Sequence, residues 1–161
     1  MPTPISHAAV GFAIGAWAPH DVPPSPRRVC LAAAACAMLP DIDVIGFAPH
    51  RGITHSLLFA VLAGIAAAFL FFPNLQSRRA RIQVMLILVV ALLSHSLLDG
   101  FSAYSRDIAY FAPFSSQRFR FAWTPLGSTS LAGQLLQEAL VLFIPAVALA
   151  RLGLRHRRAS P

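Results

Sequence analysis

Charged side chains are scarce in this sequence and lysine is absent altogether, so that charged residues make up only 12% of the chain. A soluble domain of this size carries a larger share of charge on its surface. Hydrophobic residues reach 57%, whereas ordinary soluble domains have about 45–50%. The excess apolar surface needs lipid to cover it, so the composition predicts an integral membrane protein.

Acidic residues are also few, which leaves a formal net charge of +7. Such an excess can mark a nucleic-acid-binding protein. Here all 13 basic residues are arginine, and most lie in short groups between apolar segments. Basic residues collect in this way in the cytoplasmic loops of membrane proteins. We therefore expect no nucleic-acid partner.

Cysteine and targeting signals are sparse as well. Cys30 and Cys36 lie in an Ala-rich apolar run and do not share a helix face well. We expect small core residues rather than a disulfide or a metal-binding pair. The first apolar stretch has no basic region before it and no small-residue cleavage site after it, so no cleavable signal peptide is expected.

Five apolar segments follow one another along the chain, with no internal repeat. They are residues 5–18, 29–39, 56–72, 82–98 and 131–152. The last three approach the ~20 residues that a helix needs to cross a bilayer, while the first two are shorter and either could be re-entrant. The pattern predicts an all-α integral membrane bundle of about five transmembrane helices. Residues 1–152 form its single domain and residues 153–161 a basic C-terminal tail.

The arginines predict how such a bundle is oriented. With five crossings, nine arginines fall on one side of the membrane and four on the other. The nine are Arg27, Arg28, Arg78, Arg79, Arg81, Arg151, Arg155, Arg157 and Arg158, and the four are Arg51, Arg106, Arg118 and Arg120. Because the side richer in arginine faces the cytoplasm, we expect the N-terminus outside and the C-terminus inside.

On this map, seven His and Asp side chains from four segments reach the outer membrane face. They are His7, Asp41, Asp43, His50, His55, His95 and Asp99. Ionisable groups near membrane depth are costly, and they usually face a cavity and carry function. A lone buried His is more often a hydrogen-bonded core residue, and His/Asp ion pairs can be purely structural. Seven such groups at one end of a small bundle favour metal binding.

The spacing within this group suits metal ligation. His95 and Asp99 are four positions apart, so both project from one helix face. Asp41 and Asp43 follow Pro40, and both reach one site only if the chain leaves the helix at that proline. The region around His50 and His55 can bend tightly because it contains a glycine, and the threonine at position 54 is a candidate cap for the third helix.

Mixed nitrogen and oxygen ligands suit Zn, Mn or Fe(II) better than Ca or Mg alone. Seven candidates exceed the four ligands of a structural zinc, so two ions are plausible. Asp41 or Asp43 is a candidate general base if it is not a ligand. Arg51 is a candidate for holding a substrate phosphate oxygen, and the alternative is an ion pair with Asp41 or Asp43.

Other polar and aromatic residues give weaker signals. Glu138 is expected either to face the site or to lie at a helix interface, with equal weight. His20, Asp21 and His156 are expected to be solvated. An interfacial aromatic belt is predicted from the aromatic residues after the fourth segment. These are Tyr104, Tyr110, the Phe residues from Phe111 to Phe121, and Trp123.

Three motifs carry a resemblance to a known family. They are Leu39-Pro40-Asp41-Ile42-Asp43, His50-Arg51-Gly52-Ile53-Thr54-His55-Ser56, and Ser94-His95 with Asp99. With His7 and Arg118-Phe119-Arg120-Phe121, they resemble the bacterial LexA-regulated, membrane-bound metal-dependent hydrolases. The resemblance runs from about His7 to Trp123. The order of ligands is more distantly similar to zinc-dependent phospholipase C.

The resemblance implies a multi-pass protein of the bacterial inner membrane and a multi-metal site with Asp99 as a bridging ligand. It also implies hydrolysis of a phosphoester bond in a lipid-like substrate, with Asp41, Asp43 and Arg51 as catalytic candidates and divalent metal, zinc first, as cofactor. Two alternatives remain. One is a metal or proton transporter, which needs polar residues through the whole bilayer. The other is a non-catalytic structural membrane protein.

Overall fold

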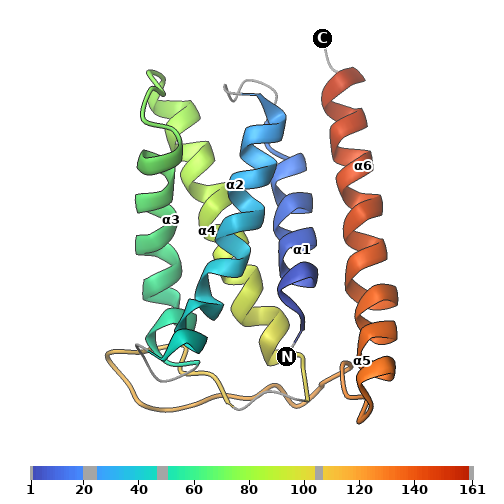
Figure 1. The fold of residues 1–161 in the computed structure, drawn as a ribbon. Helices are drawn as coiled ribbons and strands as arrows, with labels where there is room; N and C mark the ends of the chain where they lie inside the picture. Colours follow the sequence, from blue (N-terminus) through green and yellow to red (C-terminus); the bar gives the residue numbers. More distant parts are fainter. Residues whose placement is uncertain (1, 20–24, 47–50, 104–106, 160–161) are drawn as a thin grey trace.

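The computed structural model describes residues 2–19, 25–46, 51–103 and 107–159, which form helices joined by loops (Figure 1). The helices are α1 (Pro4–Ala16), α2 (Pro26–Met38), η1 (Leu39–Ile45), η2 (Ile53–His55), α3 (Leu57–Phe71), α4 (Arg78–Gly100), α5 (Leu131–Glu138), η3 (Ala139–Phe143) and α6 (Ile144–Ala159). η1 and η2 are 3-10 helices, and η3 is a π-helical turn. Within the described ranges there are isolated β-bridges but no strand. The predicted all-α class is confirmed.

Two helical stretches are long and apolar enough to cross a membrane. One is α4, with 23 residues, and the other is the continuous stretch Leu131–Arg158, with 28 residues. α1 and α3 are apolar but shorter, with 13 and 15 residues. Many large apolar side chains on the outside of the bundle are exposed, among them Leu70 and Leu86, as a lipid-facing surface requires. The number of crossings stays a prediction.

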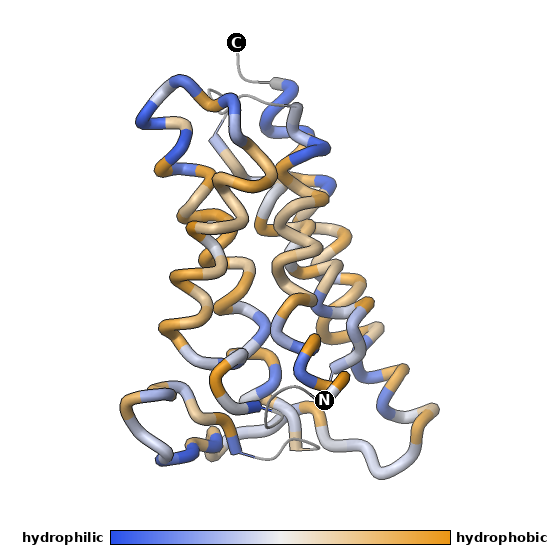
Figure 2. Tube along the Cα trace, turned by 60° about the vertical axis from the view of Figure 1, so that its left-hand side comes forward, coloured by the Kyte–Doolittle hydropathy of each residue, from blue (hydrophilic) through white to orange (hydrophobic). Residues whose placement is uncertain are grey.

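α1, α2, α3, α4 and the continuous stretch from α5 to α6 run in alternating directions (Figure 1). The start of α1, the turns η1 and η2, the end of α4 and the start of α5 therefore gather at one end of the bundle, which we call the site end. The start of α2, the start of α4 and the end of α6 lie at the other end and carry the nine clustered arginines, so we call it the arginine end. Figure 2 shows mainly apolar helices between two more hydrophilic ends.

α1 is central to the packing, because it contacts α2, α4 and α6. A Cβ on Gly11 would lie 2.5 Å from the Ala33 carbonyl oxygen and 2.6 Å from the Ala37 Cβ, so no side chain fits there. The two backbones can touch only because α1 has glycine at this point, as is usual where membrane helices pack closely. The contact fixes the C-terminal half of α2, including Ala37, against α1. Cys30 and Cys36 are buried and free, as predicted.

Pro40 ends α2 and changes the helix type. Proline has no N–H to donate back along the chain, and its ring clashes with the carbonyl four residues earlier. The chain tightens instead into the 3-10 turn η1, and the Leu39 N–H bonds to the Cys36 carbonyl. The turn stops at Gly46, which has a φ of 91°, a value that glycine adopts without strain. The prediction that the chain leaves the α-helix at Pro40 is confirmed.

Hydroxyl groups cap several of the helices. At α3 the cap is Ser56, whose Oγ accepts from the Phe59 N–H at 3.1 Å. The prediction that Thr54 caps this helix was wrong. Thr54 lies inside η2, and its hydroxyl donates to Asp43 Oδ2 at 2.6 Å. A hydrogen bond to a carboxylate is charge-assisted and therefore stronger than a bond between two neutral groups.

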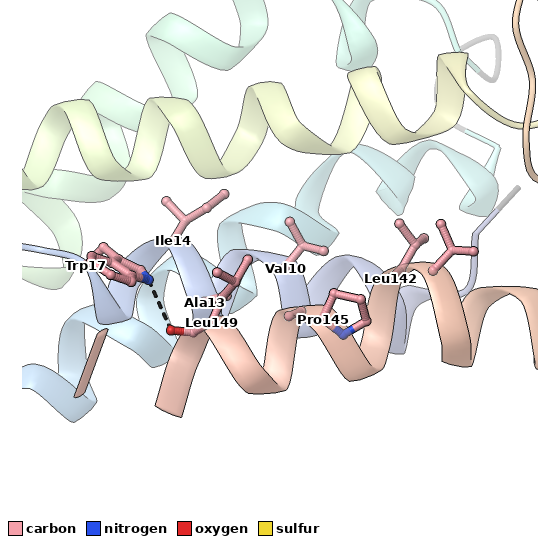
Figure 3. A pocket seen from close by; sticks show the side chains of 9 residues that line it. Val10, Ala13, Ile14, Trp17, Leu142, Pro145 and Leu149 are labelled. Carbon is pink, nitrogen blue, oxygen red and sulfur yellow. Dashed lines mark hydrogen bonds between the residues drawn. The ribbon is translucent and has the colours of Figure 1, made fainter. Parts of the chain in front are cut away.

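The last helical stretch is interrupted by the π-helical turn η3, which ends two residues before Pro145. Because proline cannot donate to the carbonyl four residues earlier, a local change of hydrogen-bond register is expected there. α6 then continues through Arg158, so the basic tail is helical. An apolar groove of about 270 Å³ lies between α1 and α6 (Figure 3). At one end of this groove Trp17 Nε1 donates to the Leu149 carbonyl at 3.0 Å.

Candidate metal site

Four His and Asp side chains meet at the site end of the bundle. Asp41 comes from η1, His55 from η2, and His95 and Asp99 from the last turns of α4. Each offers one ligand atom, and these atoms lie within 4.8 Å of one another. The side chains of His55, His95 and Asp99 are fully buried, whereas that of Asp41 is 10% exposed. This cluster could hold a metal ion.

The backbone of α2 fixes the ring of His95. His95 Nδ1 lies 2.7 Å from the Ala37 carbonyl oxygen. A carbonyl can only accept, so Nδ1 carries the proton and Nε2 presents a lone pair. Ala37 is held in place by the α1–α2 contact at Gly11. The helix packing therefore sets both the orientation and the tautomer of this His.

Asp43 and Thr54 fix the ring of His55 in the same way. Thr54 gives its one hydroxyl proton to Asp43 Oδ2. Its oxygen, which lies 3.1 Å from His55 Nδ1, must therefore accept from that ring nitrogen. Asp43 Oδ2 is itself 3.4 Å from His55 Nδ1. His55 thus also carries its proton on Nδ1 and turns a lone pair on Nε2 toward the cluster.

The two lone pairs point at nearly the same place, because His55 Nε2 and His95 Nε2 are 3.2 Å apart. Two such nitrogens repel each other unless a cation lies between them. Two ligands of one tetrahedral zinc are about 3.3 Å apart, since zinc–nitrogen bonds are about 2.0–2.1 Å long. The separation of the two ring nitrogens therefore fits a shared metal ion.

The carboxylates complete a set of two nitrogens and two oxygens. Asp41 Oδ1 is 3.4 Å from His95 Nε2 and 3.9 Å from His55 Nε2. Asp99 Oδ2 is 3.5 Å from His55 Nε2 and 4.0 Å from His95 Nε2. Both oxygens of Asp41 are buried without a hydrogen-bond partner. Buried carboxylate oxygens rarely stay unsatisfied, which is a second sign that the site fits a cation.

His7 lies on the other side of Asp99. Its ring stacks on that of His95, with centroids 3.9 Å apart, and its Nε2 is 3.5 Å from Asp99 Oδ1. Neither ring nitrogen of His7 has a hydrogen-bond partner. Asp99 therefore presents one oxygen to the His55/His95 pair and the other to His7, the arrangement expected of a ligand that bridges two ions.

Arg51 is buried at the edge of the cluster. Its Nη2 lies 2.9 Å from Asp99 Oδ2, an ion pair that the sequence did not predict. Its backbone N–H donates to Asp43 Oδ2 at 3.1 Å, and its carbonyl accepts from the Ala109 N–H at 3.2 Å. The residue has a φ of 60°, an uncommon value for a residue other than glycine that often marks functional segments.

Three residues near the cluster were not predicted. The carbonyl of Ala37 orients the His95 ring. A contact made by a backbone group cannot be predicted from the residue type. Ser96 Oγ donates to the His55 carbonyl at 2.9 Å, and Tyr110 OH donates to the Ser96 carbonyl at 3.0 Å. Burial, aided by the nearby charge of Asp99, raises the pKa of Tyr110 to about 12. Tyr110 was assigned to an interfacial aromatic belt, but it is buried, whereas Trp123 and Phe114 are exposed.

Glu138 lies at a helix interface rather than in the cluster. One carboxylate oxygen, Oε2, accepts from the Thr3 N–H at 2.7 Å and from Ser6 Oγ at 2.9 Å. The other, Oε1, accepts from Gln134 Nε2 at 2.9 Å. These bonds tie α5 to the first turn of α1, next to His7. Five residues named from the sequence lie outside the described residues: His20, Asp21, His50, Tyr104 and Arg106.

The fold and the cluster define a helical membrane protein with a candidate metal site at one end of its bundle. The chain belongs to the YdjM inner membrane protein family, whose model matches residues 1–158. It is similar to the inner membrane protein YbcI of Escherichia coli (strain K12), with 38% identity over 132 residues, which cover 76% of this chain and 74% of YbcI. No solved structure matches the chain. Its environment is therefore a lipid bilayer.

Proposed function

We propose that this protein is a membrane-embedded, metal-dependent hydrolase that cleaves a phosphoester bond of a lipid-like substrate. The observation that carries the proposal is the convergence of His55 Nε2 and His95 Nε2, which are 3.2 Å apart. The Nδ1 atoms of both rings are engaged in hydrogen bonds to other groups, so each Nε2 lone pair is left to bind a metal ion. The resemblance of the His50–Ser56 motif to membrane-bound metal-dependent hydrolases supports the same reaction class.

Zinc is the first choice of metal for a site of two imidazoles and two carboxylates, and Mn or Fe(II) also accept such ligands. The stack of His7 on His95 and its approach to Asp99 Oδ1 support a second ion. When bound, a divalent metal supplies Lewis acidity for phosphate oxygens and lowers the pKa of a bound water to about 7.

Residues of the chain take part in proton transfer and in positioning the ligands. Asp41 Oδ1 lies at ligand distance from His95 Nε2, so Oδ2 is available to take a proton from the attacking water. The water oxygen forms a bond to phosphorus, the ester P–O bond breaks, and the leaving oxygen receives the proton. Asp43, which accepts from the Arg51 N–H and the Thr54 hydroxyl and lies 3.4 Å from His55 Nδ1, is a positioning residue for the His55 ring.

The composition of the helices speaks against transport as the function. A transporter needs polar groups along a path through the bilayer. α3 consists only of apolar residues from Leu57 to Phe71, and α4 is apolar from Val84 to Leu93. The described polar cluster is confined to the site end, which suits a site that works at one membrane face.

The topology follows from five crossings with the arginine end in the cytoplasm, so the metal site lies at the outer face of the inner membrane. The two termini at opposite ends of the bundle support an odd number of crossings (Figure 1). Reporter fusions at each end are expected to place the N-terminus outside and the C-terminus inside. Both reporters on one side would rule out the five-crossing arrangement.

The substrate class is tested by incubating the metal-loaded, purified protein with phospholipids and prenyl phosphates, and with amide and carboxylic-ester lipids for comparison.

The Arg51→Lys variant tests whether Arg51 binds the substrate phosphate, because a guanidinium group forms two parallel hydrogen bonds to phosphate and an ammonium group does not. If Arg51 binds the substrate phosphate, the variant keeps its metal and melting temperature. It then loses about 1–3 kcal/mol of transition-state stabilisation, roughly 5- to 150-fold in kcat/KM.

A purely structural Arg51, engaged only with Asp99, gives another result: metal affinity or melting temperature falls together with activity. Arg120→Lys is the matched control, because Arg120 forms an exposed ion pair with Asp107 at the same end, at 2.8 Å. Cleavage of an amide or carboxylic ester, with no phosphoester cleaved, would overturn the substrate class.

A further inference from the structure

Two apolar grooves lie along the contact between α1 and α6. The groove in Figure 3 has no charged side chain in its lining. The other, of about 390 Å³, is formed by different residues of the same helices and by Ala34 of α2. Arg151 is the one charged residue among the described residues that line it, so we call it the Arg151 groove.

The Arg151 groove runs lengthwise along both helices. From α1 it is lined by Ile5, Ala8, Ala9 and Phe12, which lie three and four positions apart and therefore share one helix face. Residues from Phe143 to Leu154 line it at the same spacing. Because α1 and α6 both run from the site end to the arginine end (Figure 1), the groove is long and apolar, a shape that suits a hydrocarbon chain.

Arg151 lies at the depth where lipid phosphates are found. The helical stretch Leu131–Arg158 has 28 residues, whereas a crossing of the hydrocarbon core takes about 20. A crossing that begins at Leu131 therefore ends close to Arg151. Arg151 is exposed, and an arginine near the end of a membrane helix extends its guanidinium toward the headgroup layer.

The chain provides no described anion for this guanidinium. Of the six acidic residues, five lie at the site end and the sixth, Asp21, lies outside the described residues. The arginine end carries nine arginines, and no acidic side chain in the described ranges pairs with Arg151. An anion from outside the chain is therefore complementary to this end of the groove, and guanidinium binds phosphate oxygens in bidentate geometry.

From these observations we infer that the Arg151 groove is a binding site for an anionic phospholipid. The lipid phosphate pairs with Arg151, and one acyl chain lies between α1 and α6 toward Phe143. A zwitterionic lipid carries its own cation beside the phosphate and gains less from the excess of arginine. The site lies at the opposite end of the bundle from the metal cluster and does not depend on the proposed hydrolase function.

The bound lipid has a structural consequence for α6. Only 17% of the most apolar part of Leu131–Arg158 is buried within the protein, and α1 is the main helix against which α6 packs. An acyl chain in the Arg151 groove adds apolar contacts to both helices. Phosphatidylglycerol is therefore expected to raise the melting temperature of the protein more than phosphatidylcholine does, because a ligand of the folded state stabilises it.

The charge contact is tested by native mass spectrometry of the purified full chain in detergent. Dioleoyl phosphatidylglycerol and dioleoyl phosphatidylcholine are added separately at equal concentration. The wild type is expected to retain one phosphatidylglycerol, with an affinity roughly tenfold or more above that for phosphatidylcholine, the size of effect that a charge-assisted hydrogen bond gives. Arg151→Gln should lose this preference. Arg78→Gln, an exposed arginine of the same end outside the groove, is the matched control and should keep it.

The chain contact is tested by filling the groove. Val147→Trp and Ala8→Trp place a large ring in it from α6 and from α1, and both should release the phosphatidylglycerol with Arg151 still present. Val141→Trp, in the uncharged groove, is the control and should retain it. Retention in both groove-filling variants, or an equal loss in Arg78→Gln and Arg151→Gln, would overturn the inference. A lipid-free dimer of the wild type would assign the groove to a second copy of the chain instead.

Discussion

His95→Ala is expected to remove the metal and abolish hydrolysis. His95 Nε2 is the atom that the other three cluster residues share: it lies 3.2 Å from His55 Nε2, 3.4 Å from Asp41 Oδ1 and 4.0 Å from Asp99 Oδ2. Loss of a residue that only orients a ligand costs roughly 10–100-fold in metal affinity. Loss of a direct ligand should cost at least as much.

Metal affinity and phosphoester turnover should fall together in His95→Ala, and His55→Ala and Asp99→Ala should behave in the same way. The melting temperature should also fall, because a metal that binds only the folded state stabilises it. His156→Ala is the matched control, since this residue lies exposed near the end of α6, far from the cluster. His20→Ala serves as a second control. Equal metal content in all five variants would reject the ligand assignment.

Asp43→Asn is expected to weaken the site without dismantling it. Asp43 Oδ2 accepts from the Arg51 N–H and from the Thr54 hydroxyl, and it lies 3.4 Å from His55 Nδ1. An asparagine of the same size loses the charge that holds the Nδ1 proton of His55, so the ring can adopt the other tautomer. We expect metal affinity to fall by roughly 10–100-fold, the range found for residues that orient ligands, with the helical fold retained.

The metal affinity of Asp43→Asn decides whether Asp43 positions the His55 ring or binds the metal directly. Metal titration of Asp43→Asn should give an intermediate affinity, between wild type and His95→Ala. Asp107→Asn is the control, since Asp107 forms an exposed ion pair with Arg120, outside the cluster. A loss as complete as that of His95→Ala would make Asp43 a direct ligand, as the sequence had suggested.

The helices and the helix ends that meet could be predicted from the sequence, because both depend on features of short sequence segments. Apolar runs of the right length predicted the helices, and the arginine groups predicted which helix ends meet. His95 and Asp99 share a face because their spacing is one helical turn, and both belong to the cluster. The convergence of these residues with His55 and Asp41 followed from the order of the segments alone.

The separate positions of Asp41 and Asp43 could not be predicted. They depend on the 3-10 geometry after Pro40, which places Asp41 beside His95 Nε2 and Asp43 beside His55 Nδ1. The partner of Arg51 was missed for a related reason, because Asp99 is distant in sequence and approaches only when α4 packs beside η2. Backbone contacts such as Ala37 to His95 leave no signature in the sequence.

The hydrogen-bond partners of Glu138 could likewise be predicted only in part. Its place one turn after Gln134 was visible in the sequence, and the two residues do bond to each other. Its other partners, Thr3 and Ser6, lie at the opposite end of the chain. A buried acid in a membrane helix predicts a partner, but only the packing of α5 against α1 shows which one.

The most direct test of the metal site is elemental analysis of the purified wild-type protein, combined with X-ray absorption at the edge of the metal found. The account predicts at least one equivalent of a divalent transition metal, zinc first, bound by imidazole nitrogen and carboxylate oxygen and not by sulfur. Protein that stays metal-free after incubation with Zn, Mn and Fe(II), or that binds metal through Cys30 or Cys36, would contradict it.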